Sequence, residues 1–156
     1  MKVGETMKIA IDNGHGLNTA GKRTPLFPDG TFIKEWEFNH PTALKLAHIL
    51  QADGHEVLLV SNTTEDTPLS TRVSLANKWG ADLFVSIHYN AYQGVWGTHG
   101  GAEIFHALNS TNGKRAAELI HSEVMKVVPW RNRGVKPHSS LYVLNRTVMP
   151  AVLLEV

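Results

Sequence analysis

The chain contains no cysteine among its 156 residues. This absence excludes disulfide bonds, thiolate nucleophiles and cysteine-based zinc sites, so a zinc site here would have to use histidine and carboxylate ligands. The formal net charge of +1 gives no overall electrostatic reason to expect a nucleic-acid partner. No apolar run approaches the roughly 20 residues that a membrane-spanning helix needs, so we expect no membrane insertion.

The N-terminal residues also lack the pattern of a secretory signal. The sequence from Met1 to Asp12 enters an apolar segment almost at once and has no long apolar region followed by a cleavage site. We therefore expect the protein to be made in the cytoplasm and to act elsewhere only after release. With 156 residues, of which 42% are hydrophobic, the chain can close one core, and we expect residues 1–156 to form a single domain and a monomer.

Short apolar segments alternate with helical patterns along the chain. The apolar segments predict strands at Lys8–Asp12, Glu56–Val60, Leu83–Ile87, Ala102–Phe105, Leu141–Leu144 and Ala151–Val156. Helical spacing predicts a helix capped by Asn39, with Pro41 in its first turn and Gly54 at its end, and further helices at residues 67–79 and 113–127. The basic segment from Lys126 to Lys136 is interpreted as a solvated helix end and loop. This alternation predicts an α/β fold with a largely parallel sheet.

Two of the predicted strands lead directly into a histidine set among small residues. Residues 9–16 are IAIDNGHG and residues 83–91 are LFVSIHYNA, so His15 and His88 stand where the strands end. Open α/β sheets bind their ligands at the carboxyl ends of the strands, and neutral imidazole is the commonest protein ligand for transition metals. We therefore predict that both histidines bind a metal ion.

A catalytic zinc centre of this kind needs a third ligand and a general base. Two histidines and one glutamate are an established ligand set. Glu35, where the long loop after the first strand turns into a helix, is the favoured carboxylate, and Glu37 is the alternative. Glu155, one acid in an otherwise apolar strand, is the candidate base, because an ionised glutamate in such a run is costly unless it faces a cleft, a metal or a partner. The alternative for Glu155 is a structural ion pair with Arg146.

Four segments of the chain carry these residues: residues 12–16 (DNGHG), 35–39 (EWEFN), 86–91 (SIHYNA) and 150–155 (PAVLLE). In order and spacing they resemble the motifs of the zinc-dependent N-acetylmuramoyl-L-alanine amidases of bacterial autolysins and phage endolysins. The resemblance implies that His15, Glu35 and His88 bind Zn²⁺ and that Glu155 is the catalytic acid and base. It also implies a mixed, mostly parallel twisted sheet with helices on both faces. The implied substrate is bacterial peptidoglycan, cut at the amide between the lactyl group of N-acetylmuramic acid and L-alanine.

The chain departs from the family pattern at several places. Asn13 stands where proline is usual, Leu17 where a second glycine is frequent, and Tyr89 where a smaller residue follows the second histidine. The chain also stops one residue after Glu155, where relatives continue, and chain ends fray unless they are tied down. We therefore expect the natural protein to continue past Val156 and to carry a wall-binding domain, and we favour a phage lysin over a secreted autolysin.

Other functions and other site residues stay open at this stage. Another zinc-dependent amide hydrolase of peptidoglycan (a deacetylase or a peptidase) and a wall-binding module without catalysis are the alternatives. Arg72 is predicted to belong to a structural ion pair. The candidates for substrate contact are Lys22, Arg23 and Thr24 in the first loop, Trp96, His99 and His138. His48, His55 and His121 are interpreted as surface residues, and the aromatic rings of Trp36 and Trp130 as packing.

Overall fold

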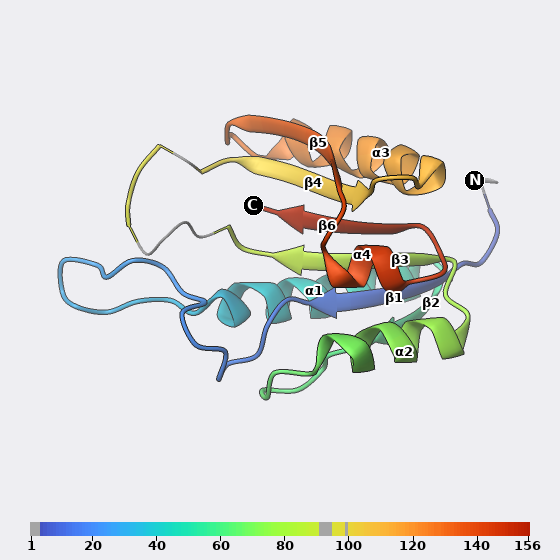
Figure 1. Ribbon diagram of the computed structural model, residues 1–156, viewed down its shortest axis with the longest axis horizontal. Coiled ribbons are helices and arrows are strands. Elements are labelled where there is room, and N and C mark those ends of the chain that lie inside the picture. The colour runs from blue at the N-terminus through green and yellow to red at the C-terminus, as the bar shows by residue number, and fades with distance from the viewer. Residues whose placement is uncertain (1–3, 91–94, 99) are drawn as a thin grey trace.

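The structure is a computed structural model that describes residues 4–90, 95–98 and 100–156. Strands and helices alternate along this part of the chain (Figure 1). Their order is β1 (Lys8–Asn13), α1 (Glu35–Ala52), β2 (Glu56–Leu59), α2 (Leu69–Trp79), β3 (Leu83–His88), β4 (Ala102–Ala107), α3 (Thr111–Val127), β5 (Asn132–His138), α4 (Tyr142–Arg146) and β6 (Ala151–Glu155).

The described strands form one sheet in the order β2-β1-β3-β6-β4-β5. The first four of these run parallel, β4 is antiparallel to β6, and β5 is parallel to β4. The predicted mixed, mostly parallel sheet is therefore confirmed. Because β1, β3 and β6 are parallel neighbours, their carboxyl ends lie at one edge of the sheet, where β3 places His88 opposite Glu155 of β6.

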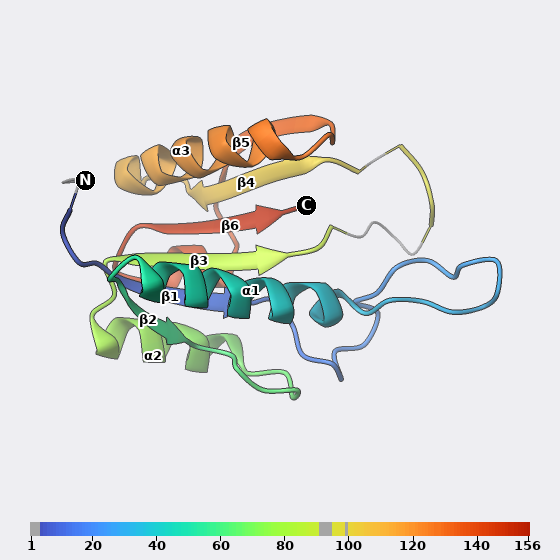
Figure 2. The ribbon, with the colours of Figure 1, turned by 180° about the vertical axis from the view of Figure 1, so that it is seen from behind.

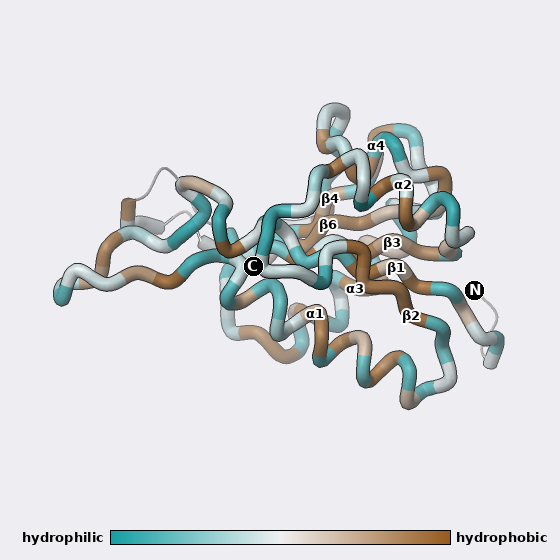
Figure 3. Tube along the Cα trace, turned by 90° about the horizontal axis from the view of Figure 1, so that it is seen from below, coloured by the Kyte–Doolittle hydropathy of each residue, from teal (hydrophilic) through white to brown (hydrophobic). Residues whose placement is uncertain are grey.

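Helices cover both faces of the sheet. Helices α2 and α4 lie on the face turned to the viewer in Figure 1, and α1 and α3 lie on the opposite face, which Figure 2 shows. Successive strand residues point to opposite faces, so Phe84 packs with α2 and α4, whereas Val85 and Ile87 pack with α1 and α3. Figure 3 shows the apolar colour along the central strands. In the part of the chain described here, no helix has the length and apolar character needed to cross a bilayer.

Two predicted elements at the end of the chain were wrong. The strand predicted at Leu141–Leu144 is the short helix α4, which packs Val143 and Leu144 against the core over β6. A short apolar run cannot be assigned to strand or helix by periodicity alone. The predicted basic loop instead contains β5, an edge strand. Its sequence, NRGVKPH, lacks the apolar alternation of a strand, and its Pro137 is tolerated because the strand lies at the edge of the sheet.

The start of the first helix was also predicted wrongly. Helix α1 begins at Glu35, with Lys34 as its N-cap residue, so Asn39 lies inside the helix and Pro41 lies beyond the first turn. The backbone N–H of Lys34 donates to Glu37 Oε2 at 2.7 Å, which stabilises this earlier start. The consequence for the site is large, because Glu35 becomes the first helical residue and has a fixed position.

Candidate metal centre and active site

His15 and His88 meet at the carboxyl edge of the sheet. His88 is the last residue of β3, and His15 follows β1 by two residues. The N–H of Gly14 donates to the carbonyl of Ile87 at 2.9 Å, which holds the chain after β1 against β3. The two imidazole rings lie with their centroids 4.9 Å apart and their planes at 89°. His15 has a φ of 63°, a left-handed conformation that few residues other than glycine adopt.

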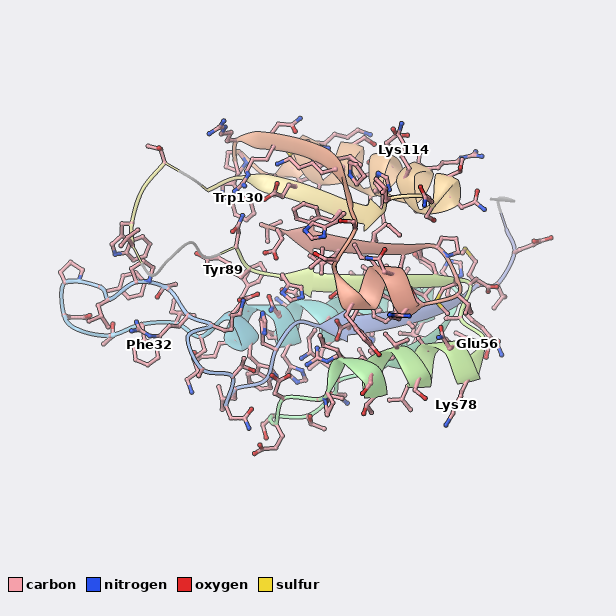
Figure 4. All side chains as sticks on the ribbon, in the orientation of Figure 1. Phe32, Glu56, Lys78, Tyr89, Lys114 and Trp130 are labelled. Carbon is pink, nitrogen blue, oxygen red and sulfur yellow. The ribbon has the colours of Figure 1, made fainter. Side chains whose placement is uncertain are left out.

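Gly14 makes room for the second imidazole. A Cβ atom at this position would lie 2.3 Å from Cε1 and 2.5 Å from both ring nitrogens of His88. A side chain here would therefore push His88 out of its position. Tyr89 is one of the three residues that depart from the family pattern. Its ring packs against that of Phe38 of α1, with the ring centroids 5.2 Å apart, and it lies at the carboxyl end of β3 in Figure 4.

Glu35 completes the cluster from the first turn of α1. Its side chain is 4% exposed, its Oε1 lies 2.9 Å from His88 Nδ1, and its Oε2 lies 3.4 Å from His15 Nε2. Asn39, one turn later and fully buried, donates from Nδ2 to the carbonyl of Gly14 at 3.0 Å. The residue that we predicted as a helix cap thus fastens α1 to the loop that carries His15. Glu37 is occupied at the helix start, so Glu35 is the acid next to both imidazoles.

Two of the three candidate ligands are in the protonation state that a divalent metal needs. The third, His88, has a raised pKa: burial would lower it, but the hydrogen bond to Glu35 and the charge of Glu155 outweigh the burial, so a metal that binds here displaces a proton from this ring. Burial lowers the pKa of His15 to about 4, so its imidazole is neutral near pH 7, as a ligand must be. Burial alone would raise the pKa of Glu35, but its hydrogen bond to His88 and the charge of that ring lower it, so the carboxyl is ionised. One donor atom from each of His15, Glu35 and His88 lies within 4.8 Å of the others. These three residues therefore fit a metal ion with two imidazole ligands and one carboxylate ligand.

Glu155 faces the same site from β6. The pairing of β6 with β3 continues one residue beyond Glu155. The N–H of Val156 donates to the carbonyl of His88 (3.2 Å), and the N–H of Asn90 donates to the carbonyl of Val156 (2.7 Å). Glu155 therefore lies inside a hydrogen-bonded ladder that holds it against β3. Burial raises the pKa of the Glu155 carboxyl to about 7, against the opposing charge of His88. No ion pair joins Glu155 to Arg146 in the part of the chain that the structure describes.

A cavity of about 500 Å³ opens onto these groups. His15, His88 and Glu155 line it, together with Leu141 and Tyr142 at the start of α4. Glu35 contacts both imidazoles but does not itself line the cavity. The cavity therefore exposes two candidate ligands and the candidate base to a molecule that enters it.

A buried ion pair supports the strand ends beneath the cavity. Arg72 of α2 is 1% exposed and donates to Asp12 Oδ1 at 2.6 Å and to Asp66 Oδ1 at 2.7 Å. Asp12 Oδ2 also accepts from Ser86 Oγ at 2.7 Å, and this bond ties the end of β1 to β3. The prediction that Arg72 belongs to a structural ion pair is confirmed. Asp12 and Asp66 are the partners that sequence reasoning missed.

Replacing Arg72 with methionine is expected to lower the free energy of unfolding by about 3–5 kcal/mol, because the buried Asp12 carboxylate then loses its counter-charge. Arg115→Met on the exposed side of α3 is the matched control and is expected to change stability by less than about 0.5 kcal/mol. Urea unfolding of both variants measures the difference. Equal midpoints for the two variants would contradict the role given to Arg72.

Glu103 of β4 is a further buried acid that the sequence analysis did not identify. It lies opposite Glu155 across the β4–β6 pair and is 4% exposed. Its Oε1 lies 2.8 Å from Arg133 Nη2, and its Oε2 pairs with Lys136 Nζ. Two cations of the predicted basic loop therefore neutralise a buried carboxylate. A single acid in the short strand segment AEIF was the signal, and it is the same signal that marked Glu155.

The remaining predicted contacts have mixed outcomes. Lys22 lines the cavity, whereas Trp96 lies beside Phe27 with ring centroids 5.3 Å apart. His138 does not line the cavity; its Nδ1 accepts from the backbone N–H of Leu141 at 3.2 Å. His121, interpreted as a surface residue, is 8% exposed and therefore buried. His99, and Ala91 of the third motif, lie outside the described residues.

The fold and the site together define an α/β protein with a candidate His–Glu–His metal centre and a buried acid at the carboxyl edge of its sheet. Residues 9–156 match the family model described as N-acetylmuramoyl-L-alanine amidase. The chain is 36% identical over 151 residues to N-acetylmuramoyl-L-alanine amidase CwlM of Bacillus licheniformis, and the match covers 96% of this chain and 55% of that protein. It is 33% identical over 151 residues to the sporulation-specific amidase of Bacillus subtilis, with the same two coverages.

A solved structure extends these matches. The N-acetylmuramoyl-L-alanine amidase from Clostridium difficile 630 superimposes with a TM-score of 0.83 at 30% identity, covering 96% of this chain and 78% of that one. The chain belongs to the N-acetylmuramoyl-L-alanine amidase family. It spans about half the length of the curated relatives described above. The resemblance found in the four sequence motifs is thereby confirmed.

Proposed function

We propose that this protein is a zinc-dependent N-acetylmuramoyl-L-alanine amidase that cuts peptidoglycan between the lactyl group of N-acetylmuramic acid and the L-alanine of the stem peptide. The observation that supports the proposal is the convergence of His15, Glu35 and His88 within 4.8 Å, beside a cavity that Glu155 also lines. Membership of the amidase family gives the substrate class.

His15, Glu35 and His88 would hold the Zn²⁺ ion. When bound, Zn²⁺ supplies Lewis-acid chemistry, which makes water more acidic and polarises a carbonyl oxygen. Two of the three ligands are in their ligand forms before a metal binds, whereas His88, whose pKa is raised, gives up a proton on binding. The neutral ring of His15 and the ionised carboxylate of Glu35 are in their ligand forms, and Asn39 fixes the loop between them.

Glu155 moves the proton. As the water oxygen attacks the carbonyl carbon, the Glu155 carboxylate takes one proton from that water. When the carbon–nitrogen bond breaks, Glu155 returns the proton to the nitrogen of the departing L-alanine. Burial raises the pKa of the Glu155 carboxyl above its ordinary value, which favours a group that can both accept and release a proton near neutral pH. The pairing of β6 with β3 holds this side chain beside His88 throughout.

The test is a digestion of purified peptidoglycan by the zinc-loaded protein, followed by mass spectrometry of the products. The expected products are free L-alanine amino termini and glycan strands with intact N-acetyl groups. Removal of the metal with a chelator should abolish the reaction, and added Zn²⁺ should restore it. Free glucosamine amines would instead indicate a deacetylase, and new ends within the stem peptide a peptidase. If the protein bound purified walls but showed no metal-dependent cleavage of them, the proposal would be overturned.

Three further points remain proposals about the whole protein. We propose that it acts as a monomer, that a wall-binding domain accompanies the catalytic domain, and that the enzyme reaches the wall after release from the cytoplasm. Sedimentation of the purified protein tests the first of these. A pull-down with purified walls tests the second, since the chain from residue 1 to 156 alone is then expected to bind walls only weakly.

A further inference from the structure

Lys22 has a fixed backbone beside the candidate metal centre. The N–H of Glu35 donates to the carbonyl of Lys22 at 3.0 Å, so the lysine is hydrogen-bonded to the residue that would supply the carboxylate ligand. The residues that follow Lys22 pair with those that precede Glu35: Arg23 forms an antiparallel bridge with Lys34, and the N–H of Thr24 donates to the carbonyl of Ile33 at 2.8 Å. This paired segment is the base of a loop that projects beyond the sheet. Figure 4 labels Phe32 on that loop.

The other cations of this loop already have partners. Arg23 donates to the carbonyl of Thr24 at 3.1 Å and lies over the ring of Phe32, 4.7 Å from its centroid. Lys34 Nζ donates to the carbonyl of Leu17 at 2.6 Å. The side chain of Lys22 has no hydrogen bond or ion pair within the residues that the structure describes, and it is exposed.

Lys22 also lines the cavity, and its ammonium group can bind an anion there. Among the described residues that line it, Arg72 is the other lysine or arginine, and its donors are taken by Asp12, Asp66 and backbone carbonyls. An anionic group in the cavity would therefore meet Lys22 as its free partner.

The chemistry of the substrate indicates which anion this is. In the intact substrate the lactyl carboxyl of N-acetylmuramic acid forms the scissile amide, so the sugar next to this bond carries no charge. The peptide side is different. The residue after L-alanine is a γ-linked D-glutamate, whose α-carboxylate is free unless it is amidated. This carboxylate is the negative charge nearest to the bond that is cut.

We propose that Lys22 is a specificity-determining residue that binds the α-carboxylate of the second stem-peptide residue. This inference rests on the proposed amidase function. Lys22 would then favour peptidoglycan with D-glutamate over peptidoglycan in which that residue is amidated to D-isoglutamine. The amide has the same shape but no charge, so it forms no ion pair with the ammonium group.

The experiment compares two muropeptides that differ only in this group, with zinc-loaded wild type, Lys22→Met, Lys22→Arg and the control Lys45→Met on the exposed side of α1. For the D-glutamate muropeptide, Lys22→Met is expected to raise KM about tenfold, the worth of one charged hydrogen bond, with kcat little changed. For the D-isoglutamine muropeptide the same variant should match wild type. Lys22→Arg should keep most of the preference, and Lys45→Met all of it.

A binding measurement supplies a second readout that does not depend on turnover. Calorimetry with L-alanyl-D-glutamine, in which the γ-carboxyl is an amide and the α-carboxylate is free, should give a Kd about tenfold weaker for Lys22→Met than for wild type. An equal fall in kcat on both muropeptides would place Lys22 at the reacting centre and overturn the inference, as would an unchanged KM for the D-glutamate muropeptide. If wild type releases no L-alanine amino terminus from either muropeptide, the proposed amidase function itself fails.

Discussion

Replacing Glu155 with glutamine is expected to lower kcat by about 10²–10⁴-fold, the usual contribution of a positioned acid–base group. Glutamine has the size of glutamate and can keep its place opposite His88, but it cannot accept a proton. Metal binding should survive, because the group of His15, Glu35 and His88 does not include Glu155. Metal content and turnover, measured on the same sample, test both parts of this prediction.

Glu103→Gln is the matched control for that experiment. Glu103 lies directly opposite Glu155 on the neighbouring strand, but it is paired with Arg133 and Lys136 and does not line the cavity. The same chemical change there is expected to cost far less turnover than Glu155→Gln. If Glu155→Gln kept a near-normal rate, or if it lost its zinc, the assignment of Glu155 as the base would be wrong.

Replacing Glu35 with glutamine is expected to weaken zinc binding by more than about 100-fold, since a change in a mere supporting residue already costs 10–100-fold. Activity should be lost with the metal. The charge of the carboxylate is what the cluster needs, and a neutral amide in its place would leave the two imidazoles without an anionic partner. Competition with a coloured chelator measures the affinity, and circular dichroism checks that the fold is kept.

Glu37→Gln provides the comparison, two residues further along the same helix. The Glu37 side chain accepts the N–H of Lys34, and the oxygen of a glutamine can accept the same hydrogen bond. Zinc affinity and activity are therefore expected to stay at the wild-type level. The reverse pattern, in which Glu37→Gln loses the metal and Glu35→Gln retains it, would show that Glu37 and not Glu35 is the carboxylate ligand.

The sequence predicted the strands that carry the site better than the elements around it. β1, β3 and β6 are buried on both faces and appear as nearly continuous apolar runs, so their positions and the residues at their ends could be predicted. β5 could not, because an edge strand is covered less and needs no apolar alternation. Leu141–Leu144 failed for a different reason: four apolar residues suit a buried helix as well as a buried strand.

Some features of the site could likewise be predicted from the sequence, whereas others depended on the folded structure. The sequence by itself determined that His15 and His88 end two strands, that Glu155 interrupts an apolar run, and that the chain resembles an amidase. Only the tertiary structure placed Glu35, and not Glu37, beside the two imidazoles, because this placement depends on where α1 begins, and hydrogen bonds from Asn39 and Lys34 hold that start. The free side chain of Lys22 also depended on folding, because its neighbours find their partners only when the loop closes on α1. A sequence shows which groups are present, whereas the balance of burial and hydrogen bonding in the folded chain decides which of them remain available.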